Sequence, residues 1–214
     1  MTSCCYASAP ARSLADSVNG GRNIKLRMKH SDVILSPQSK TTKTSHQNVG
    51  HAENPSAVTS QVFLALGSNL NDPVFQIKQA IRSLAQTVNT IECAQLYQSK
   101  PLGPQDQPNF VNTVISGYTS LSPEELLITI QDIEQQQQRV KTQHWGPRTI
   151  DIDILFYGNL RINTPELTIP HKELFNRTFV AIPLFDLIPS GITPIGDQLD
   201  RNRYDSSTLV RIDT

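Results

Sequence analysis

The run from Thr149 to Phe156 places two acidic residues at alternate positions among β-branched and apolar ones. This composition predicts a buried strand. Because successive side chains of a strand point to opposite faces, the carboxylates of Asp151 and Asp153 leave the same face and lie close together. The fold must therefore cover one face of this strand with apolar groups and accommodate two negative charges on the other.

These two charges require a partner. Two carboxylates on a half-buried strand repel each other and lose hydration, so we expect a cation between them. Mg²⁺ prefers oxygen ligands and commonly shares its coordination shell with substrate phosphates. Arg148 precedes the strand in a Gly-Pro turn, where its guanidinium can bind phosphate oxygens. The alternative is an edge strand whose acidic residues pair with surface lysines; the neighbouring tryptophan, turn and arginine favour the metal site.

The hydrophobic pattern predicts a globular domain from about residue 61 onward. Asp72 is expected to cap one helix ahead of Pro73, and Ser122 with Glu125 forms the capping box of another. Strands are expected at residues 62–66, 91–99, 110–119 and 149–156. The order strand, helix, strand, strand, helix, strand is that of a ferredoxin-like fold. We therefore expect an α+β fold, a mostly antiparallel sheet with helices packed on its faces.

Basic residues surround the single tryptophan, Trp145, at Arg139, Lys141, His144 and Arg148. A basic loop beside a metal site provides the charge neutralisation that a polyphosphate requires. We expect this loop to be mobile without ligand and to close over a nucleotide. An ordinary solvated loop is the alternative.

Two further donors come later in the chain, at His171 and Arg177. A single histidine is more often structural than a ligand, and only the neighbouring motifs favour a role for this one. The sequence contains no G-x-x-x-x-G-K-[ST] loop and no G-x-G-x-x-G. Side chains and a metal, instead of a glycine-rich backbone, would therefore hold the phosphates.

Two aromatic residues stand where loops meet the predicted elements. Phe110 opens a strand after a proline-rich loop, and Phe179 follows the Asn176-Arg177 turn. Two such rings can enclose a flat heterocycle by stacking, with Asn112 on the same strand face as Phe110 available to bind a ring edge. Packing in the core is the alternative for either phenylalanine.

Four separated blocks of sequence resemble one enzyme family. They are Ala-Leu-Gly-Ser-Asn-Leu at 65–70, Pro-Leu-Gly-Pro-Gln-Asp-Gln-Pro-Asn-Phe-Val-Asn at 101–112, Trp-Gly-Pro-Arg-Thr-Ile-Asp-Ile-Asp-Ile at 145–154, and Ile-Pro-His at 169–171 with Asn-Arg at 176–177. The blocks resemble the 6-hydroxymethyl-7,8-dihydropterin pyrophosphokinases of folate biosynthesis. The resemblance covers roughly residues 62–196.

The resemblance implies transfer of pyrophosphate from ATP to the pterin hydroxymethyl group, with release of AMP. It implies that Asp151 and Asp153 bind two Mg²⁺ ions and that Arg139 and Arg148 act on the transferring group. The implied ATP-binding positions are Gln131, Glu134, Lys141, His144, Trp145, Ile154, Thr168, His171 and Arg177. The implied pterin-binding positions are Gly67, Ser99, Pro101, Leu102, Phe110, Asn112 and Phe179.

Three positions depart from the family pattern. Arginine is frequent in the family where Lys141 and His144 stand, and the loop is slightly shorter here. Lysine loses the bidentate geometry of arginine and histidine is only partly charged near neutral pH, so we expect weaker ATP binding or slower closure. Phe110 stands where tyrosine is common, and stacking should survive that change.

Residues 1–58 are polar and poor in large apolar side chains, which predicts a disordered N-terminal extension. An upstream-start artefact and an organellar transit peptide are the alternatives. The pyrophosphokinase domain is expected at residues 59–200, and residues 201–214 are expected to be a loosely attached C-terminal tail.

Composition limits the remaining functions. The chain has 214 residues and a net charge of zero, so no basic field suggests nucleic acid. Its three cysteines form no C-x-x-C pair, which favours a reducing, cytoplasmic location, and no apolar run suffices for a membrane span. We expect a monomer whose partners are ATP and the pterin. A non-catalytic ferredoxin-like module that stacks bases on its aromatics and an inactive paralogue are the competing hypotheses.

Overall fold

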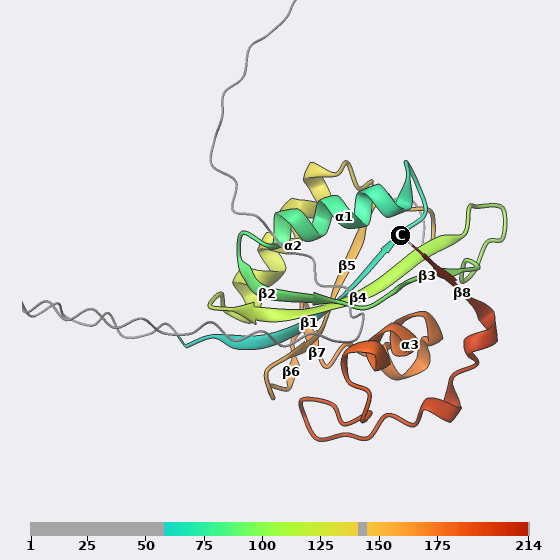
Figure 1. Cartoon of the computed structure of the whole chain (residues 1–214). Helices are drawn as coiled ribbons and strands as arrows, with labels where there is room; N and C mark the ends of the chain where they lie inside the picture. The colour runs from blue at the N-terminus through green and yellow to red at the C-terminus, as the bar shows by residue number, and fades with distance from the viewer. Residues whose placement is uncertain (1–57, 141–144, 214) are drawn as a thin grey trace, which may run out of the picture.

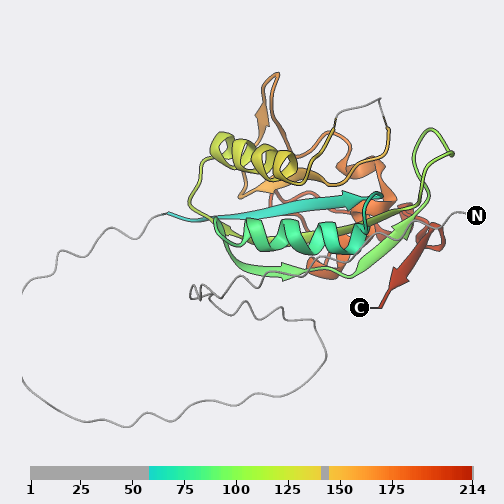
Figure 2. The same ribbon diagram turned by 90° about the horizontal axis from the view of Figure 1, so that it is seen from above.

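The computed structural model describes residues 58–140 and 145–213. In chain order the elements are β1 (Ser60–Ser68), α1 (Pro73–Leu84), β2 (Val88–Cys93), β3 (Leu96–Ser99), β4 (Phe110–Thr119), α2 (Pro123–Gln136), β5 (Asp151–Tyr157), β6 (Ile162–Asn163), β7 (Thr168–Ile169), α3 (Thr178–Leu187) and β8 (Leu209–Ile212). Short 3₁₀ turns η1, η2 and η3 occupy Leu174–Asn176, Arg201–Arg203 and Ser206–Thr208. Figure 1 shows the arrangement, and Figure 2 shows it from above.

The main sheet has the order β5-β1-β4-β3-β8, and β2 pairs with β4 as well. Every pairing in it is antiparallel. The order of elements from β1 to β5, with β1 between β5 and β4, is that of a ferredoxin-like fold, so the expected fold class is confirmed.

One expected strand is divided in two. Residues 91–99 were expected to form a single strand, but β2 and β3 are separated at Ala94 and Gln95. The backbone N–H of Ala94 still donates to Val114 O at 2.8 Å. The N–H of Gln95 instead donates to the carboxylate of Asp186 on α3 at 3.1 Å, so the strand is interrupted in favour of a contact with a helix.

Both expected helix caps are present. The Asp72 side chain accepts a hydrogen bond from Phe75 N at 3.2 Å, with Pro73 at the start of α1. At α2, Ser122 Oγ accepts from Glu125 N at 3.2 Å while Glu125 Oε2 accepts from Ser122 N at 2.7 Å. These bonds satisfy backbone donors that the first helical turn leaves free.

Helices cover both faces of the sheet. α1 and α2 lie on one face, and α3 with the C-terminal segment lies on the other (Figure 1). The apolar face of α1 is buried, as its spacing predicts, at Ile77, Ala80, Ile81 and Leu84. Two hydrophobic cores result, one on each side of the sheet, and the aspartates of β5 face the α3 side.

The C-terminal segment differs from the expected loose tail over residues 201–213. β8 pairs with β3 along its whole length. Tyr204 is 8% exposed, its ring meets Phe185 edge to face, and its hydroxyl donates to Phe175 O at 3.3 Å.

The expectation of disorder at residues 1–58 falls almost wholly outside the described residues. None of the helices that the structure describes is long and apolar enough to cross a membrane.

Candidate active site

The two aspartates project from one face of β5, as the strand periodicity predicts. Asp151 and Asp153 are partly exposed, whereas Ile152 and Ile154 between and after them are buried. β5 is the edge strand of the sheet, as the alternative interpretation required. Among the residues that the structure describes, its carboxylates nevertheless pair with arginines and a histidine, not with lysines.

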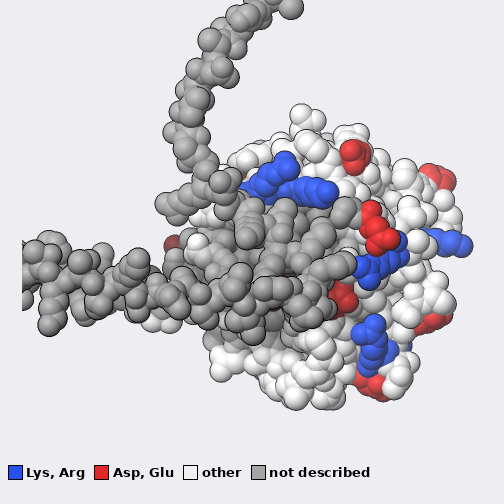
Figure 3. Space-filling view, in the orientation of Figure 1, with Lys and Arg blue, Asp and Glu red and all other residues white. Residues whose placement is uncertain are grey.

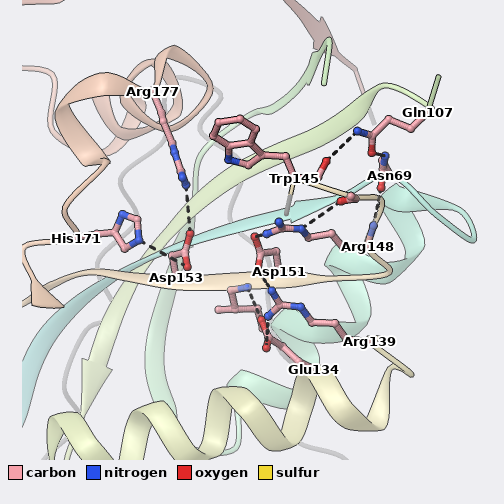
Figure 4. Close-up of polar contacts among 12 residues, drawn as sticks. Asn69, Gln107, Glu134, Arg139, Trp145, Arg148, Asp151, Asp153, His171 and Arg177 are labelled. Carbon is pink, nitrogen blue, oxygen red and sulfur yellow. Dashed lines mark hydrogen bonds and ion pairs between the residues drawn. The ribbon is translucent and has the colours of Figure 1, made fainter. Parts of the chain in front are cut away.

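Asp151 lies between two guanidinium groups (Figure 4). Its Oδ1 is 2.5 Å from Nη2 of Arg139, and its Oδ2 pairs with Nη1 of Arg148. Arg139 also pairs with Glu134, whose Oε1 accepts from the Ile152 N–H at 2.8 Å. The segment that follows α2 is thereby tied to the edge of β5, and Arg139 is held beside Asp151.

Burial and neighbouring charges shift the protonation of this cluster. Burial raises the pKa of the Glu134 carboxyl, and the ion pair with Arg139 opposes that rise. For Arg139 burial acts to lower the pKa, but Asp151 and Glu134 outweigh it and the pKa is raised. Arg139 therefore keeps its positive charge near neutral pH.

The negative charge of Asp153 is less well compensated than that of Asp151, because its cationic partners lie farther away. Its oxygens are 3.9 Å from Nε2 of His171 and 3.8 Å from Nη1 of Arg177, which are ion-pair distances without a close hydrogen bond. Burial, then repulsion from Asp151, raises the pKa of Asp153, and His171 and Arg177 oppose the rise. A further cation beside Asp153 would relieve this unfavourable charge.

Asn69, at the end of β1, joins three loops. Its Oδ1 accepts from the Arg148 N–H at 2.8 Å, and its own N–H donates to the Arg148 carbonyl at 3.1 Å. Its Nδ2 donates to Gln107 Oε1 at 3.1 Å and to Pro108 O at 3.0 Å. Gln107 Nε2 in turn donates to the carbonyl of Trp145 at 2.9 Å. Asn69 is 2% exposed, so this buried network fixes the loop before β4 and the loop before β5 against the end of β1.

A cavity opens between the aspartates and the N-terminal end of α3. Asn112 lies at its base, where its Nδ2 donates to Ser99 Oγ at 2.9 Å. A Cβ added to Gly67 would come within 3.0 Å of Asn112 Oδ1, so glycine leaves room for that amide. Phe110 and Phe179 both line this cavity, whose walls are formed by Ala65, Leu66, Gly67, Ser99, Lys100, Leu102, Phe110, Asn112, Thr113, Trp145, Arg148, Asp151, Asp153, Arg177, Phe179 and Val180.

Most of the expected pterin positions therefore meet in one place, together with both aspartates, Trp145, Arg148 and Arg177. Several expected ATP positions lie outside the cavity lining. Gln131 is exposed on α2, Ile154 is buried in the core beneath α1 and α2, and Thr168 lies on β7. Lys141 and His144 lie outside the described residues.

Sequence reasoning missed the roles of Lys100, Thr113 and Gln107. Lys100 and Thr113 directly follow Ser99 and Asn112, and all four line the cavity. Gln107 stands within the proline-rich loop, and its contacts with Asn69 and Trp145 span 38 positions each. Only the family resemblance, which included Asn69 and Gln107, carried a signal for that pair.

The aspartate pair suits a hard divalent cation. Both groups supply carboxylate oxygens on one strand face, and the raised pKa of Asp153 reflects negative charge in need of compensation. Within the described ranges, no group of three or more His, Cys, Asp or Glu side chains could hold a metal. A cation here would thus take its remaining ligands from water and substrate phosphates, which is how Mg²⁺ is commonly held.

Charges outside the site are mixed. On the part of the surface that described residues form in Figure 3, Lys and Arg side chains lie beside Asp and Glu side chains.

Comparison with known proteins identifies the family. The sequence model of the 7,8-dihydro-6-hydroxymethylpterin-pyrophosphokinase (HPPK) family matches residues 63–189. The 2-amino-4-hydroxy-6-hydroxymethyldihydropteridine pyrophosphokinase of Haemophilus influenzae is 48% identical over 134 residues, which are 62% of this chain and 84% of that protein. The protein of the same name in Pseudomonas aeruginosa is 44% identical over 141 residues, 65% of this chain and 87% of that protein.

More distant relatives are longer. A mitochondrial folate synthesis bifunctional protein of Arabidopsis thaliana is 39% identical over 62% of this chain and 24% of its own length. A crystal structure of Plasmodium falciparum HPPK-DHPS, a triple mutant with pteroate, matches with a TM-score of 0.53 and 15% identity, over 72% of this chain and 44% of that one. That structure shows the shared fold alone. From the match to the family sequence and the close bacterial relatives, the chain belongs to the 7,8-dihydro-6-hydroxymethylpterin-pyrophosphokinase family.

Proposed function

We infer that this chain transfers pyrophosphate from ATP to 6-hydroxymethyl-7,8-dihydropterin, giving the pterin diphosphate and AMP in folate biosynthesis. Family membership carries this conclusion. The cavity supports it, because aromatic and amide groups on one side meet carboxylates and arginines on the other. The pterin hydroxyl loses its proton to solvent as its oxygen forms a bond to the β-phosphorus of ATP. The bond from that phosphorus to the α,β-bridging oxygen breaks, and AMP leaves with the electron pair of that bond.

Asp151 and Asp153 are proposed to hold two Mg²⁺ ions. When bound with ATP, these ions neutralise the phosphate oxygens and polarise the β-phosphorus. Both oxygens of Asp151 pair with arginines. We propose that at least one of these guanidinium groups moves from the carboxylate to phosphate oxygens as the nucleotide binds.

Arg139 and Arg148 are proposed to stabilise charge on the transferring group. Their ion pairs with Asp151 keep two permanent cations beside the place where negative charge develops. His171 and Arg177, beside Asp153, are proposed to bind the nucleotide with Glu134, Gln131, Trp145, Thr168, Lys141 and His144, whereas the side chain of Ile154 is buried in the core on the other face of β5.

The pterin is proposed to bind between Phe110 and Phe179. Asn112 and Ser99 would face its polar edge, with Gly67, Pro101 and Leu102 completing the enclosure. The hydrogen bond from Asn112 to Ser99 supports this role, since it orients the amide at the base of the cavity. We also propose that the protein acts as a cytoplasmic monomer without nucleic-acid or membrane partners.

The deciding experiment measures AMP release from ATP and Mg²⁺, with and without 6-hydroxymethyl-7,8-dihydropterin. Pterin-dependent AMP establishes the reaction. Pterin binding without AMP would instead identify an inactive paralogue. In the same assay, Phe179→Ala should weaken pterin binding far more than ATP binding, and an equal loss of both would refute the aromatic enclosure.

A further inference from the structure

A hydrogen-bonded link joins β3 to α3 beyond the proposed pterin site. The Tyr97 hydroxyl donates to the Asp186 carboxylate, with oxygen distances of 3.0 and 3.3 Å to its two oxygens. The Gln95 N–H donates to the same carboxylate at 3.1 Å. Both side chains are only partly exposed, so this contact between strand and helix is shielded from bulk water.

Each end of the link lies on an element that also forms a wall of the cavity. Tyr97 and Ser99 are two residues apart on β3, so their side chains leave the same face of the sheet. Across the strand pair, Tyr97 is opposite Asn112 and Ser99 is opposite Phe110. The strand that carries Tyr97 is therefore continuous with the base of the cavity.

Asp186, the other end of the link, lies on α3, and α3 also carries Phe179 in the opposite wall of the cavity. Phe179 and Asp186 are seven positions apart on α3, about two turns, and so lie on the same side of the helix. Phe179 lines the cavity, whereas Asp186 accepts the hydrogen bonds from β2–β3. The distance between α3 and the sheet at Asp186 thus constrains where the Phe179 ring sits above Ser99 and Asn112.

We propose that Tyr97 and Asp186 are positioning residues that set the separation of the two walls of the pterin site and so tune affinity for the pterin. The inference rests on the proposed pterin site. Burial, together with the Asp186 charge and hydrogen bond, raises the pKa of Tyr97 to about 12, so the hydroxyl stays protonated and remains a donor throughout the working pH range.

The test compares steady-state constants for both substrates in full-length variants. Tyr97→Phe removes only the hydroxyl, and Asp186→Ala removes the acceptor. Tyr97→Phe should raise the KM and Kd for the pterin by about threefold to tenfold, the effect of one hydrogen bond. Asp186→Ala also removes the acceptor of the Gln95 N–H and should raise both constants at least as much. For both variants kcat and the ATP KM should stay within about twofold of wild type. Asp186→Asn keeps one oxygen acceptor and should recover most of the affinity. Tyr118→Phe, an exposed tyrosine of β4, is the matched control.

A double variant separates positioning from general stability. Tyr97→Phe combined with Asp186→Ala should be no worse for pterin affinity than Asp186→Ala alone, because the second change already removes the acceptor of the Tyr97 hydroxyl. Lower thermal stability with an unchanged pterin KM, or an equal rise of both KM values, would overturn the proposal. Wild-type turnover and Phe179→Ala in the same assay report independently on the proposed function and site.

Discussion

Asn69 holds Arg148 at both of its backbone polar groups: the amide oxygen of Asn69 accepts from the Arg148 N–H at 2.8 Å, and the Asn69 N–H donates to the Arg148 carbonyl at 3.1 Å. The arginine that reaches Asp151 is thus fixed from the end of β1, across 79 positions of sequence. The position of this guanidinium therefore depends on a buried amide, Asn69, which is not among the residues that line the cavity.

Asn69→Ala should therefore reduce both stability and turnover. The change removes the hydrogen bonds that Asn69 makes with the Arg148 N–H, the Pro108 carbonyl and Gln107 Oε1, which we expect to lower the unfolding free energy by about 2 kcal/mol or more. Loss of the fixed Arg148 should lower kcat by about tenfold. Urea unfolding and AMP release measure the two effects. Asn163→Ala, at an exposed position of β6, is the control and should change neither.

The two arginines of Asp151 should differ in their effect on stability. Arg139 bridges Asp151 and the buried Glu134, whereas among the described residues the one carboxylate that pairs with Arg148 is Asp151. We expect Arg139→Ala to cost about 3 kcal/mol, because it leaves a buried carboxylate uncompensated, and Arg148→Ala roughly 1 kcal/mol. Urea denaturation of the ligand-free protein measures both. Equal losses would contradict the bridging role, and exposed Arg82→Ala should lie within about 0.5 kcal/mol of wild type.

Asp153→Asn should separate activity from folding. If Asp153 binds Mg²⁺, the neutral amide should lower kcat by at least about 100-fold at saturating substrates. The fold should be as stable as wild type or more stable, since the change removes repulsion with Asp151. Pterin-dependent AMP release and thermal unfolding are the measurements, with exposed Asp132→Asn on α2 as the control. Full activity of Asp153→Asn with Mg²⁺ would exclude the metal assignment.

Cys93 should be an unreactive thiol. Burial raises its pKa from 9.0 to about 11, so at pH 8 alkylation should be about 100-fold slower than in the unfolded chain. Between these two values the folded state retains a proton that the unfolded state loses, so the contribution of Cys93 to the unfolding free energy falls as pH rises from 9.0 to about 11. A Cys4→Ser/Cys5→Ser background leaves Cys93 as the single thiol for iodoacetamide kinetics. Rapid alkylation of the folded protein at pH 8 would contradict the shift.

Deletion of residues 1–58 should leave catalysis unchanged. β1 begins at Ser60, and the first residue lining the cavity is Ala65. We expect kcat and both KM values to stay within about twofold of the full chain in the AMP-release assay. A large drop in kcat on deletion would show that the N-terminal segment takes part in the reaction.

Local signals were sufficient for much of the fold. The alternation along β5 predicted that Asp151 and Asp153 share a face, and the side-chain oxygens of Asp72 and Ser122 marked where two helices begin. Each of these features depends on residues only two or three positions apart in the sequence. Periodicity and capping chemistry therefore determine them before tertiary contacts form.

The features that local sequence patterns did not predict depend on contacts between residues far apart in the chain. The break between β2 and β3 depends on Asp186, which lies 91 positions after Gln95. The pairing of β8 depends on the free edge of β3, which no pattern within Leu209–Ile212 can indicate. The cavity likewise combines residues from Ala65 to Val180, so its shape follows from the assembled sheet and from α3.

The alternation of aspartate and isoleucine on β5 also protects the fold itself. β5 pairs with β1 from Val62 to Gly67 through a register that contains one irregularity. A slip by a single residue would turn Ile152 and Ile154 toward the cavity and force two carboxylates into the apolar layer beneath α1 and α2. The burial of those charges would cost far more than a mispaired strand could regain. The acidic residues proposed for catalysis thus also exclude the nearest misfolded alignment of the sheet.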